Sequence, residues 1–188
     1  SAEAYGTWIA SKAGNRMRKR EMKGYSGDAY LGIDSGSTTT KIAVTDGEGN
    51  LLYHYYAPNG GDPIGTVGRG LERLAAACAE QGASLGIRGS CSTGYGEDLI
   101  RAAYSLDEGI IETIAHYLAA RDIDPQVSFI LDIGGQDMKC FKIEDGAISN
   151  IFLNEACSSG CGSFLQTFAQ ALGYDVKEFA ALGLFADR

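Results

Sequence analysis

The sequence predicts an α/β fold, a mixed β-sheet with flanking helices, and three observations favour this class. Short apolar runs alternate with longer segments in which apolar residues recur at helical spacing. Two of the apolar runs, ending at Asp34 and Asp132, are followed at once by a glycine-rich turn. The segments LGIDSGSTTTK (31–41) and LDIGGQDMKC (131–140) thereby repeat one pattern: a strand that ends in Asp, a turn of small residues, and a second strand that carries Lys.

Composition limits the class of protein. The chain has 188 residues, of which 45% are hydrophobic and 21% charged, and no apolar stretch is long enough for a transmembrane helix. The net charge of −8 argues against nucleic-acid binding, and the basic run 16–23 is interpreted as a solvated helix face or linker. Five cysteines, an odd number, argue against a disulfide framework. These features predict a cytoplasmic protein without nucleic-acid or membrane partners.

Three segments are predicted along the chain. Residues 1–29 are interpreted as a linker or a connection from an upstream part, because the chain starts with Ser and glycines interrupt its helical spacing. Residues 30–155 are predicted to form a first subdomain. Residues 156–188 are predicted to begin a second subdomain, which is truncated.

Strands and helices of the first part follow from hydrophobic periodicity and turn residues. The predicted strands are 30–34, 41–46, 50–57 and 85–92. The predicted helices are 63–81, 97–103 and 107–121. Gly47–Asn50 is expected to form a hairpin turn, and Cys78 falls on the buried face of its helix, where a small core residue is preferred.

One of these helices carries Glu112 and His116 a single turn apart. This spacing could place two metal ligands on one helix face. Since no second ligand pair accompanies them, a structural or surface role is preferred.

The second part repeats the strand pattern. Its predicted strands are 127–133, 138–145 and 147–154, and its predicted helices are 159–173 and 175–184. Asp145 and Gly146 form a tight turn between the last two strands. The order βββαβαα followed by βββα is that of a ribonuclease-H-like half and the first helix of a second half.

The residue types at the two turns suit phosphate binding. An Asp at a strand end can hold the water shell of Mg²⁺, and Gly36, Gly134 and Gly135 let backbone N–H groups approach phosphate oxygens. Lys41 can supply a positive charge. Hydroxyl donors come from Ser35, Ser37, Thr38 and Thr39. Either turn alone is also a good ordinary hairpin sequence. Two such turns, each after a strand that ends in Asp, favour a phosphate site.

Cys157 and Cys161 stand close together at the start of a predicted helix. The positive end of a helix lowers the pKa of a thiol, and thiolates are the usual ligands of iron–sulfur clusters. Two cysteines do not complete such a site, so the residues alone leave free or packing cysteines as likely an interpretation as metal binding.

Four separated motifs carry a resemblance to a known family over residues 30–185. The two Asp-ended segments resemble the phosphate loops of the actin, hexokinase and Hsp70-like ATPase superfamily. Together with STGYG (92–96) and NEACSSGCGSFL (154–165), they resemble the activators of 2-hydroxyacyl-CoA dehydratases and the related benzoyl-CoA reductase ATPase subunits. The resemblance implies the first half of an actin-like ATPase fold and the start of the second half.

The resemblance also implies site roles for matching residues. ATP or ADP would be bound by Asp34, Gly36, Ser37, Thr38, Thr39, Lys41, Gly134 and Gly135. Asp34 and Asp132 would hold Mg²⁺ through water, and Asp132, Gln136 and Asp137 are the predicted catalytic residues, with Gln136 or Asp137 orienting the attacking water.

For the cysteines, the resemblance implies a [4Fe–4S] cluster shared by two identical subunits. Cys157 matches the first cluster ligand of the family, and the second family ligand would lie beyond Arg188. Cys161 stands where the family motif has Thr, which leaves a substitute ligand, a redox-active neighbour or an incidental thiol open.

The implied function is ATP-driven transfer of a low-potential electron from the cluster to a 2-hydroxyacyl-CoA dehydratase or acyl-CoA reductase component. One alternative is a phosphotransferase like the sugar and acetate kinases, which would leave Cys157 unexplained. Another is a non-catalytic nucleotide-sensing module of a larger protein. The fragment is expected to be inactive alone.

Overall fold

The computed structural model describes residue 7, residues 17–154 and residues 161–183. This part of the chain folds into two compact units. The first unit runs from Met17 to Ala119, and the second contains the residues from Ala120 onward. The predicted subdomain boundary at residue 155 is a different division of the chain and stays a prediction.

The first unit is built on a five-stranded mixed sheet with the strand order β3-β2-β1-β4-β5. Its strands are β1 (Ser26–Ser35), β2 (Thr39–Asp46), β3 (Leu51–Pro58), β4 (Ser84–Thr93) and β5 (Glu108–Gly109). β1, β2 and β3 pair antiparallel in chain order, whereas β4 pairs parallel with both β1 and β5. Parallel neighbours need a crossover, and the connection from β1 to its neighbour β4 runs through β2, β3 and helix α2 (Pro63–Gln81).

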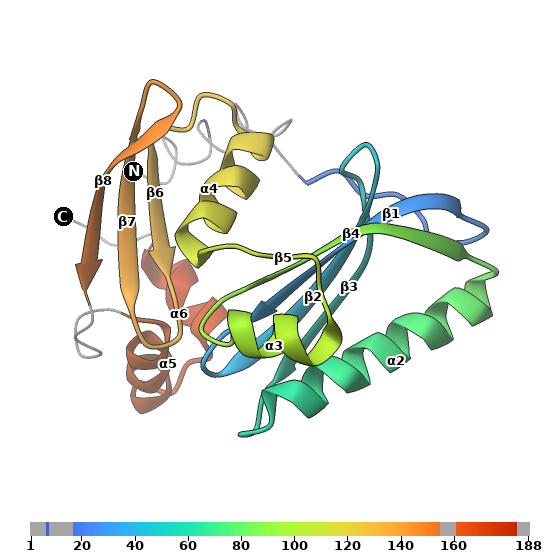
Figure 1. Ribbon diagram of the computed structural model, residues 1–188. Coiled ribbons are helices and arrows are strands. Elements are labelled where there is room, and N and C mark those ends of the chain that lie inside the picture. The colour runs from blue at the N-terminus through green and yellow to red at the C-terminus, as the bar shows by residue number, and fades with distance from the viewer. Residues whose placement is uncertain (1–6, 8–16, 155–160, 184–188) are drawn as a thin grey trace. The chain divides into compact units, whose positions relative to one another are not determined.

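Helices α2 and α3 (Glu97–Tyr104) cover one face of this sheet (Figure 1). The core beneath them contains Ile33, Ile42, Val67 and Ile100, each at most 1% exposed. Along β2 every second residue is buried, as expected for a strand with one face against helices. At Gly70 of α2, a Cβ would lie 2.5 Å from the Cδ1 atom of Ile42 and 2.8 Å from the Tyr55 ring, so these side chains fill the space that a side chain at position 70 would need.

The ends of α2 follow from its capping residues. The Asp62 side chain accepts a hydrogen bond from the Gly65 N–H (2.8 Å), and Pro63 opens the first turn. Gly82 ends the helix with φ of 62°, a conformation that favours glycine. The predicted helix 63–81 is therefore confirmed at both ends.

The segment before β1 is part of the first unit, although the sequence places residues up to 29 in a connection. Met22 is 3% exposed within a core cluster, and Lys19 forms a parallel bridge with Leu51 of β3. The chain also extends β1 back to Ser26, four residues before the predicted strand. Packing against the edge strand β3 thus begins before the apolar run that marked the domain in the sequence.

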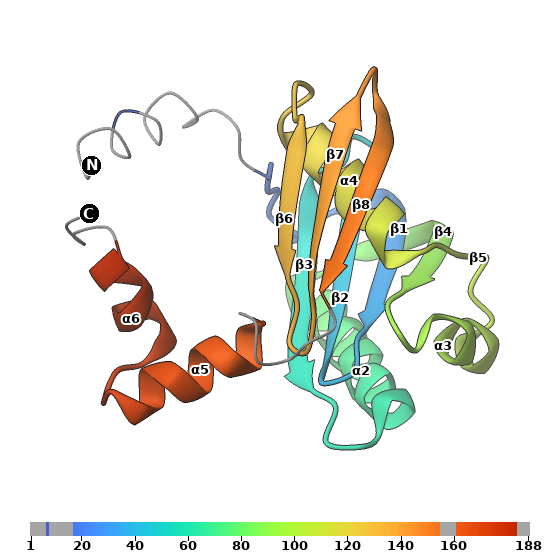
Figure 2. The same ribbon diagram turned by 90° about the vertical axis from the view of Figure 1, so that its left-hand side faces the viewer.

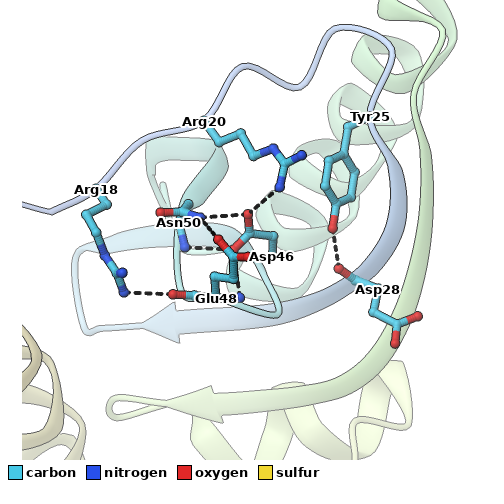
Figure 3. A network of polar contacts seen from close by, with 7 residues as sticks. All are labelled: Arg18, Arg20, Tyr25, Asp28, Asp46, Glu48 and Asn50. Carbon is cyan, nitrogen blue, oxygen red and sulfur yellow. Dashed lines mark hydrogen bonds and ion pairs between the residues drawn. The ribbon is translucent and has the colours of Figure 1, made fainter.

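A polar network fixes this segment to the turn between β2 and β3 (Figure 3). The Asp46 carboxylate accepts hydrogen bonds from the Glu48 and Asn50 N–H groups (both 2.9 Å), from the Asn50 side chain (2.8 Å) and from Arg20 (3.2 Å). These donors, the Asn50 side chain first, lower the pKa of the Asp46 carboxyl to about 2 against the effect of burial. The network confirms the hairpin turn predicted at 47–50.

The second unit contains a three-stranded antiparallel sheet in the order β6-β7-β8, with helices α5 and α6 after it (Figure 2). The elements are β6 (Phe129–Ile133), β7 (Met138–Glu144), β8 (Ala147–Asn154), α5 (Gly162–Ala171) and α6 (Val176–Gly183). Asp145 and Gly146 both have positive φ, 52° and 74°, which is the conformation of a type I′ hairpin turn. The tight turn predicted from Asp-Gly is confirmed.

The predicted α/β class, a ribonuclease-H-like mixed sheet with flanking helices, is confirmed. One element was wrong: the predicted helix 107–121 contains a strand at its start, and helix α4 begins only at Glu112 and ends at Ile123. Glu108 and Gly109 pair with β4, and the Ile110 N–H donates to the Ser92 carbonyl (2.9 Å). These sheet contacts outweigh the helical spacing of the apolar residues. None of the helices in residues 17–154 and 161–183 combines the length and hydrophobicity that a membrane crossing requires.

Candidate phosphate-binding site

The two Asp-ended segments fold into hairpins with the same hydrogen-bond pattern. Asp34 of β1 stands opposite Lys41 of β2, and Asp132 of β6 stands opposite Lys139 of β7. The turn of the first hairpin is closed by the Gly36 N–H, which donates to the Thr39 carbonyl (3.0 Å). A matching bond closes the second turn.

In that second turn the Gly134 N–H donates to the Asp137 carbonyl (2.9 Å). The donor and acceptor have the same sequence offsets from the strand-end Asp as in the first turn. The repeat that the sequence suggested is therefore a repeat of backbone geometry as well.

The tips of both turns present backbone N–H groups to solvent. Ser37 and Thr38 in the first turn, and Gly135 and Gln136 in the second, are exposed. Their N–H groups have no hydrogen-bond partner in the part of the chain that the structure describes. Adjacent free N–H groups in a turn form a concave donor set that suits an anion.

The end of β1 has a carboxylate with one oxygen in use and one without a partner. Asp34 Oδ2 accepts from the Lys41 ammonium group at 2.9 Å, whereas Asp34 Oδ1 is buried and, within the described residues, has no partner. The hydroxyl oxygen of Ser35, a fully buried residue, is in the same situation. A buried polar atom without a hydrogen bond costs free energy, so Asp34 Oδ1 fits a water molecule or the water shell of a cation.

The STGYG motif lies directly against this end of β1. The Gly96 N–H donates to the Ser35 carbonyl (2.9 Å), and a Cβ on Gly94 would lie 2.6 Å from Asp34 Oδ1. Gly94 also has φ of 89°, which favours glycine. The sequence marked this motif only through the family resemblance, and the structure brings its glycines to the Asp34 carboxylate.

In the second hairpin the lysine forms an ion pair with a residue of the turn. The Lys139 ammonium group pairs with Asp137 at 3.0 Å, and the Asp137 carboxylate lies beside Gly134, where a Cβ would come within 2.5 Å of Oδ1. Asp132 is half-buried. Of the three predicted catalytic residues, Gln136 is the one exposed at the tip of the turn.

The start of helix α5 is bonded to the same turn. The Gly162 N–H donates to the Gly134 carbonyl (2.8 Å) and the Ser163 N–H to the Gly135 carbonyl (3.0 Å). A Cβ on Gly162 would lie 3.0 Å from the Gly134 oxygen, so glycine allows this close approach. The first N–H groups of α5 are thus used by the protein's own turn.

The structure gives different surroundings to the candidate thiols. Cys161 is 1% exposed at the N-cap of α5, and its sulfur lies 3.3 Å from the Ser163 hydroxyl oxygen. Burial raises the pKa of the Cys78 and Cys91 thiols, as expected for packing cysteines. Cys157, the predicted cluster ligand, lies outside the described residues.

Each hairpin brings its own predicted residues together. The first set, from Asp34 to Lys41, belongs to the first unit, and the second set, from Asp132 to Asp137, belongs to the second unit. A joint nucleotide site made from both sets stays a prediction.

The chain is similar in sequence to a known ATPase family and to two dehydratase activators. The family model described as the BadF/BadG/BcrA/BcrD ATPase family matches residues 31–187. The (R)-2-hydroxyglutaryl-CoA dehydratase activating ATPase of Acidaminococcus fermentans is 32% identical over 156 residues, 81% of this chain and 57% of that protein. The 2-hydroxyisocaproyl-CoA dehydratase activator of Clostridioides difficile is 32% identical over 158 residues, 82% of this chain and 56% of that protein.

Solved structures agree with these matches. The activator of the 2-hydroxyisocaproyl-CoA dehydratase from Clostridium difficile, solved with bound ADPNP, has a TM-score of 0.68 at 28% identity and covers 85% of this chain and 58% of that chain. The structure of the Acidaminococcus fermentans (R)-2-hydroxyglutaryl-CoA dehydratase component A also has a TM-score of 0.68, at 27% identity, and covers 86% of this chain and 61% of that chain.

The chain spans a little more than half the length of the curated relatives it matches. The family model, in contrast, covers most of this chain and includes both hairpins. The chain therefore belongs to the BadF/BadG/BcrA/BcrD ATPase family.

Proposed function

We propose that this chain is the ATP-binding part of a cytoplasmic activator that hydrolyses ATP. The activator drives low-potential electron transfer from a [4Fe–4S] cluster to a 2-hydroxyacyl-CoA dehydratase or a related acyl-CoA reductase component. The observation that carries the proposal is the pair of matching hairpins with free N–H groups at their tips. Relatives named as dehydratase activators, one of them solved with bound ADPNP, support the reaction class.

Phosphate binding is assigned to both turns. The N–H groups of the first turn, with the hydroxyls of Ser37, Thr38 and Thr39, would donate to phosphate oxygens, and Lys41 would add a positive charge. Gly134 and Gly135 would give a second phosphate oxygen close access to backbone. Magnesium, when bound, neutralises phosphate charge, and the free oxygen of Asp34 fits one of its water ligands.

Hydrolysis is assigned to the second hairpin. Gln136, exposed at the tip of the turn, would orient the attacking water, because phosphoryl transfer relies on positioning and charge stabilisation. Lys139 would hold the Asp137 carboxylate in place beside Gly134. Asp132, at the end of β6, would accept hydrogen bonds from water in the magnesium shell.

The cluster is assigned to Cys157 in a homodimer, with the buried Cys161 as a packing residue rather than a ligand. The cluster, when bound, supplies a single low-potential electron. The hydrogen bonds from Gly162 and Ser163 to the second turn support a link between nucleotide and cluster, because a movement of the turn would move the start of α5.

Anaerobic reconstitution of the full-length protein with iron and sulfide tests the cluster assignment. We expect a cluster absorbance that is lost in Cys157→Ala and kept in Cys78→Ala, the matched control on α2. An unchanged spectrum in Cys157→Ala would contradict the cluster role. For the nucleotide site, Asp132→Ala should abolish ATP turnover, and full activity would remove the assignment.

A further inference from the structure

We infer that Asn59 is a positioning residue for the first phosphate turn, with its side-chain amide holding the Gly36–Ser37 peptide so that the Ser37 N–H faces a bound phosphate. The inference rests on the proposed function, since it concerns the same turn. It adds a residue that neither the phosphate-loop pattern nor the family resemblance singled out.

Asn59 contacts the turn with three of its groups. Its Nδ2 donates to the Gly36 carbonyl (2.7 Å), and its backbone N–H donates to the Thr38 carbonyl (2.9 Å). Its Oδ1 accepts from the Thr40 hydroxyl (2.6 Å). Asn59 is 5% exposed, so these bonds are largely shielded from competing water.

The position of Asn59 follows from the sheet. Thr39 pairs with Pro58, the last residue of β3, and Asn59 comes directly after it. Asn59 therefore stands beside the turn where the ladder between β2 and β3 ends.

The geometry of the peptide unit between Gly36 and Ser37 determines the direction in which the Ser37 N–H points. Within one peptide unit the C=O and the N–H point in opposite directions. When the Gly36 carbonyl accepts from Asn59 on the buried side, the N–H of Ser37, in the same peptide, points away from Asn59. That N–H is one of the free donors at the exposed tip.

Asn59 also connects the turn to the start of α2. Its carbonyl oxygen accepts from the Asp62 N–H (2.9 Å) and from the hydroxyl of Thr66 (3.3 Å), a fully buried residue. The turn is thereby attached to a helix that packs on the sheet. Attachment to a packed helix limits the movement of the turn before nucleotide arrives, which lowers the ordering cost of binding.

An amide is needed because the side chain donates and accepts at once. In Asn59→Asp the shape and the acceptor for Thr40 remain, but the donor to Gly36 is lost at mildly alkaline pH. Thr66→Val is the control for a general loosening of the network, because it removes the contacts of the Thr66 hydroxyl with the Asn59 and Asp62 carbonyls but keeps the bond from the Asp62 N–H and the Asn59 side chain.

The test is calorimetric titration of the full-length protein with ADPNP and magnesium. We expect Asn59→Asp to weaken binding about ten-fold or more, and Thr66→Val to stay within about three-fold of the unmodified protein. Equal affinities for Asn59→Asp and the unmodified protein would overturn the inference.

Two further measurements separate the possible failures. If Lys41→Ala loses ADPNP affinity while Asn59→Asp keeps it, the Asn59 inference fails and the phosphate site stands. If the unmodified protein binds no ADPNP, or Lys41→Ala binds normally, the proposed function itself fails.

If Asn59→Asp does not fold, amide hydrogen exchange in the unmodified protein tests the proposed orientation of the Ser37 N–H. The Gly36 amide should be protected with and without ADPNP, because it is bonded to the Thr39 carbonyl. The Ser37 amide should exchange rapidly in the free protein and become protected by ADPNP. Slow exchange of Ser37 in the free protein would contradict the proposed orientation.

Discussion

The hairpins at Asp34 and Asp132 have the same turn geometry in very different surroundings. Ile33, just before the first Asp, is 1% exposed, whereas Ile133, just after the second Asp, is 46% exposed. The first hairpin belongs to a five-stranded sheet covered by helices, and the second to a three-stranded sheet whose strand β6 exposes Phe129 and Leu131. Local sequence therefore determines the turn, and the rest of the fold determines its burial.

The two hairpins can also be compared through the ion pairs that their lysines form. Lys41 forms an ion pair across the hairpin with the strand-end Asp34, and Lys139 forms an ion pair with Asp137 inside the turn. Among the described residues, one buried oxygen of the Asp34 carboxylate in the first hairpin has no partner, whereas the Asp137 carboxylate in the second is ion-paired and lies beside Gly134. Under the proposed function both turns would donate to phosphate, and the second turn, with Gln136 exposed at its tip, would also orient the attacking water.

The largest expected effect on stability is at Gly94, which lies beside the strand-end Asp34 of the first hairpin. In Gly94→Ala the new Cβ would meet Asp34 Oδ1 at 2.6 Å and the Ser35 carbonyl oxygen at 2.7 Å, at a φ of 89°. We expect a loss of about 3 kcal/mol or more in the free energy of unfolding, measured by urea denaturation. Gly47→Ala, with open space around it, is the control. Equal stability of the two variants would show that the STGYG turn does not constrain Asp34.

A smaller loss of stability is expected at acid pH. It should differ between the carboxylates at the far ends of the two hairpins, Asp46 and Glu144. Asp46 at the end of β2 is buried with a pKa of about 2, below the ordinary 3.8. Its contribution of about 2 kcal/mol is fully present above pH ~4 and is lost as the pH falls toward about 2. Denaturation of the unmodified protein and Asp46→Asn over this range should show the two free energies converging.

Glu144 at the end of β7 provides the comparison in the second hairpin. Its hydrogen bond from Lys142 lowers the pKa of the carboxyl, but the side chain is exposed. Glu144→Gln should leave the stability unchanged across the same pH range, because water screens an exposed ion pair. A pH dependence as large as that of Asp46→Asn would contradict the difference in burial.

Next in size is the contact between the second turn and α5. Gly162→Ala places a Cβ 3.0 Å from the Gly134 oxygen, so the helix start must shift. We expect a loss of about 1–2 kcal/mol in the free energy of unfolding, and a smaller thermal stabilisation by ADPNP than in the unmodified protein. Gly183→Ala, with open space in α6, should have neither effect.

The smallest effects on stability are expected for the two lysines. Lys41→Met should change the free energy of unfolding by less than about 1 kcal/mol because the lysine is partly exposed, and Lys139→Met, whose lysine is 16% exposed, by about 1 kcal/mol. Their kinetics should differ, with Lys41→Met raising the KM for ATP and Lys139→Met lowering kcat. The same kinetic change in both variants would argue against separate roles for the hairpins.

Sequence reasoning succeeded where the signal is local. The Asp-Gly turn at 145, the capped helix 63–81 and the repeat of the two hairpins all depend on residues close together in the chain, and all three are confirmed. The predicted site residues of each hairpin also lie at their turn or strand end.

The features that the sequence did not predict depend on contacts between distant residues. β5 is too short for a hydrophobic pattern and exists because it pairs with β4. Met22 joins the core from a stretch that looks polar, and Asn59 reaches Gly36 only because β2 and β3 are paired. No spacing rule within one segment could have found these contacts.

The burial of Cys161 has a practical consequence. Its thiol is buried at the N-cap of α5, so a thiol reagent can reach it only when the structure around it opens. The rate at which Cys161 is labelled therefore measures how often the opening occurs. Labelling with and without ADPNP, followed by mass spectrometry of the Cys161 peptide, would time this opening without any change to the sequence.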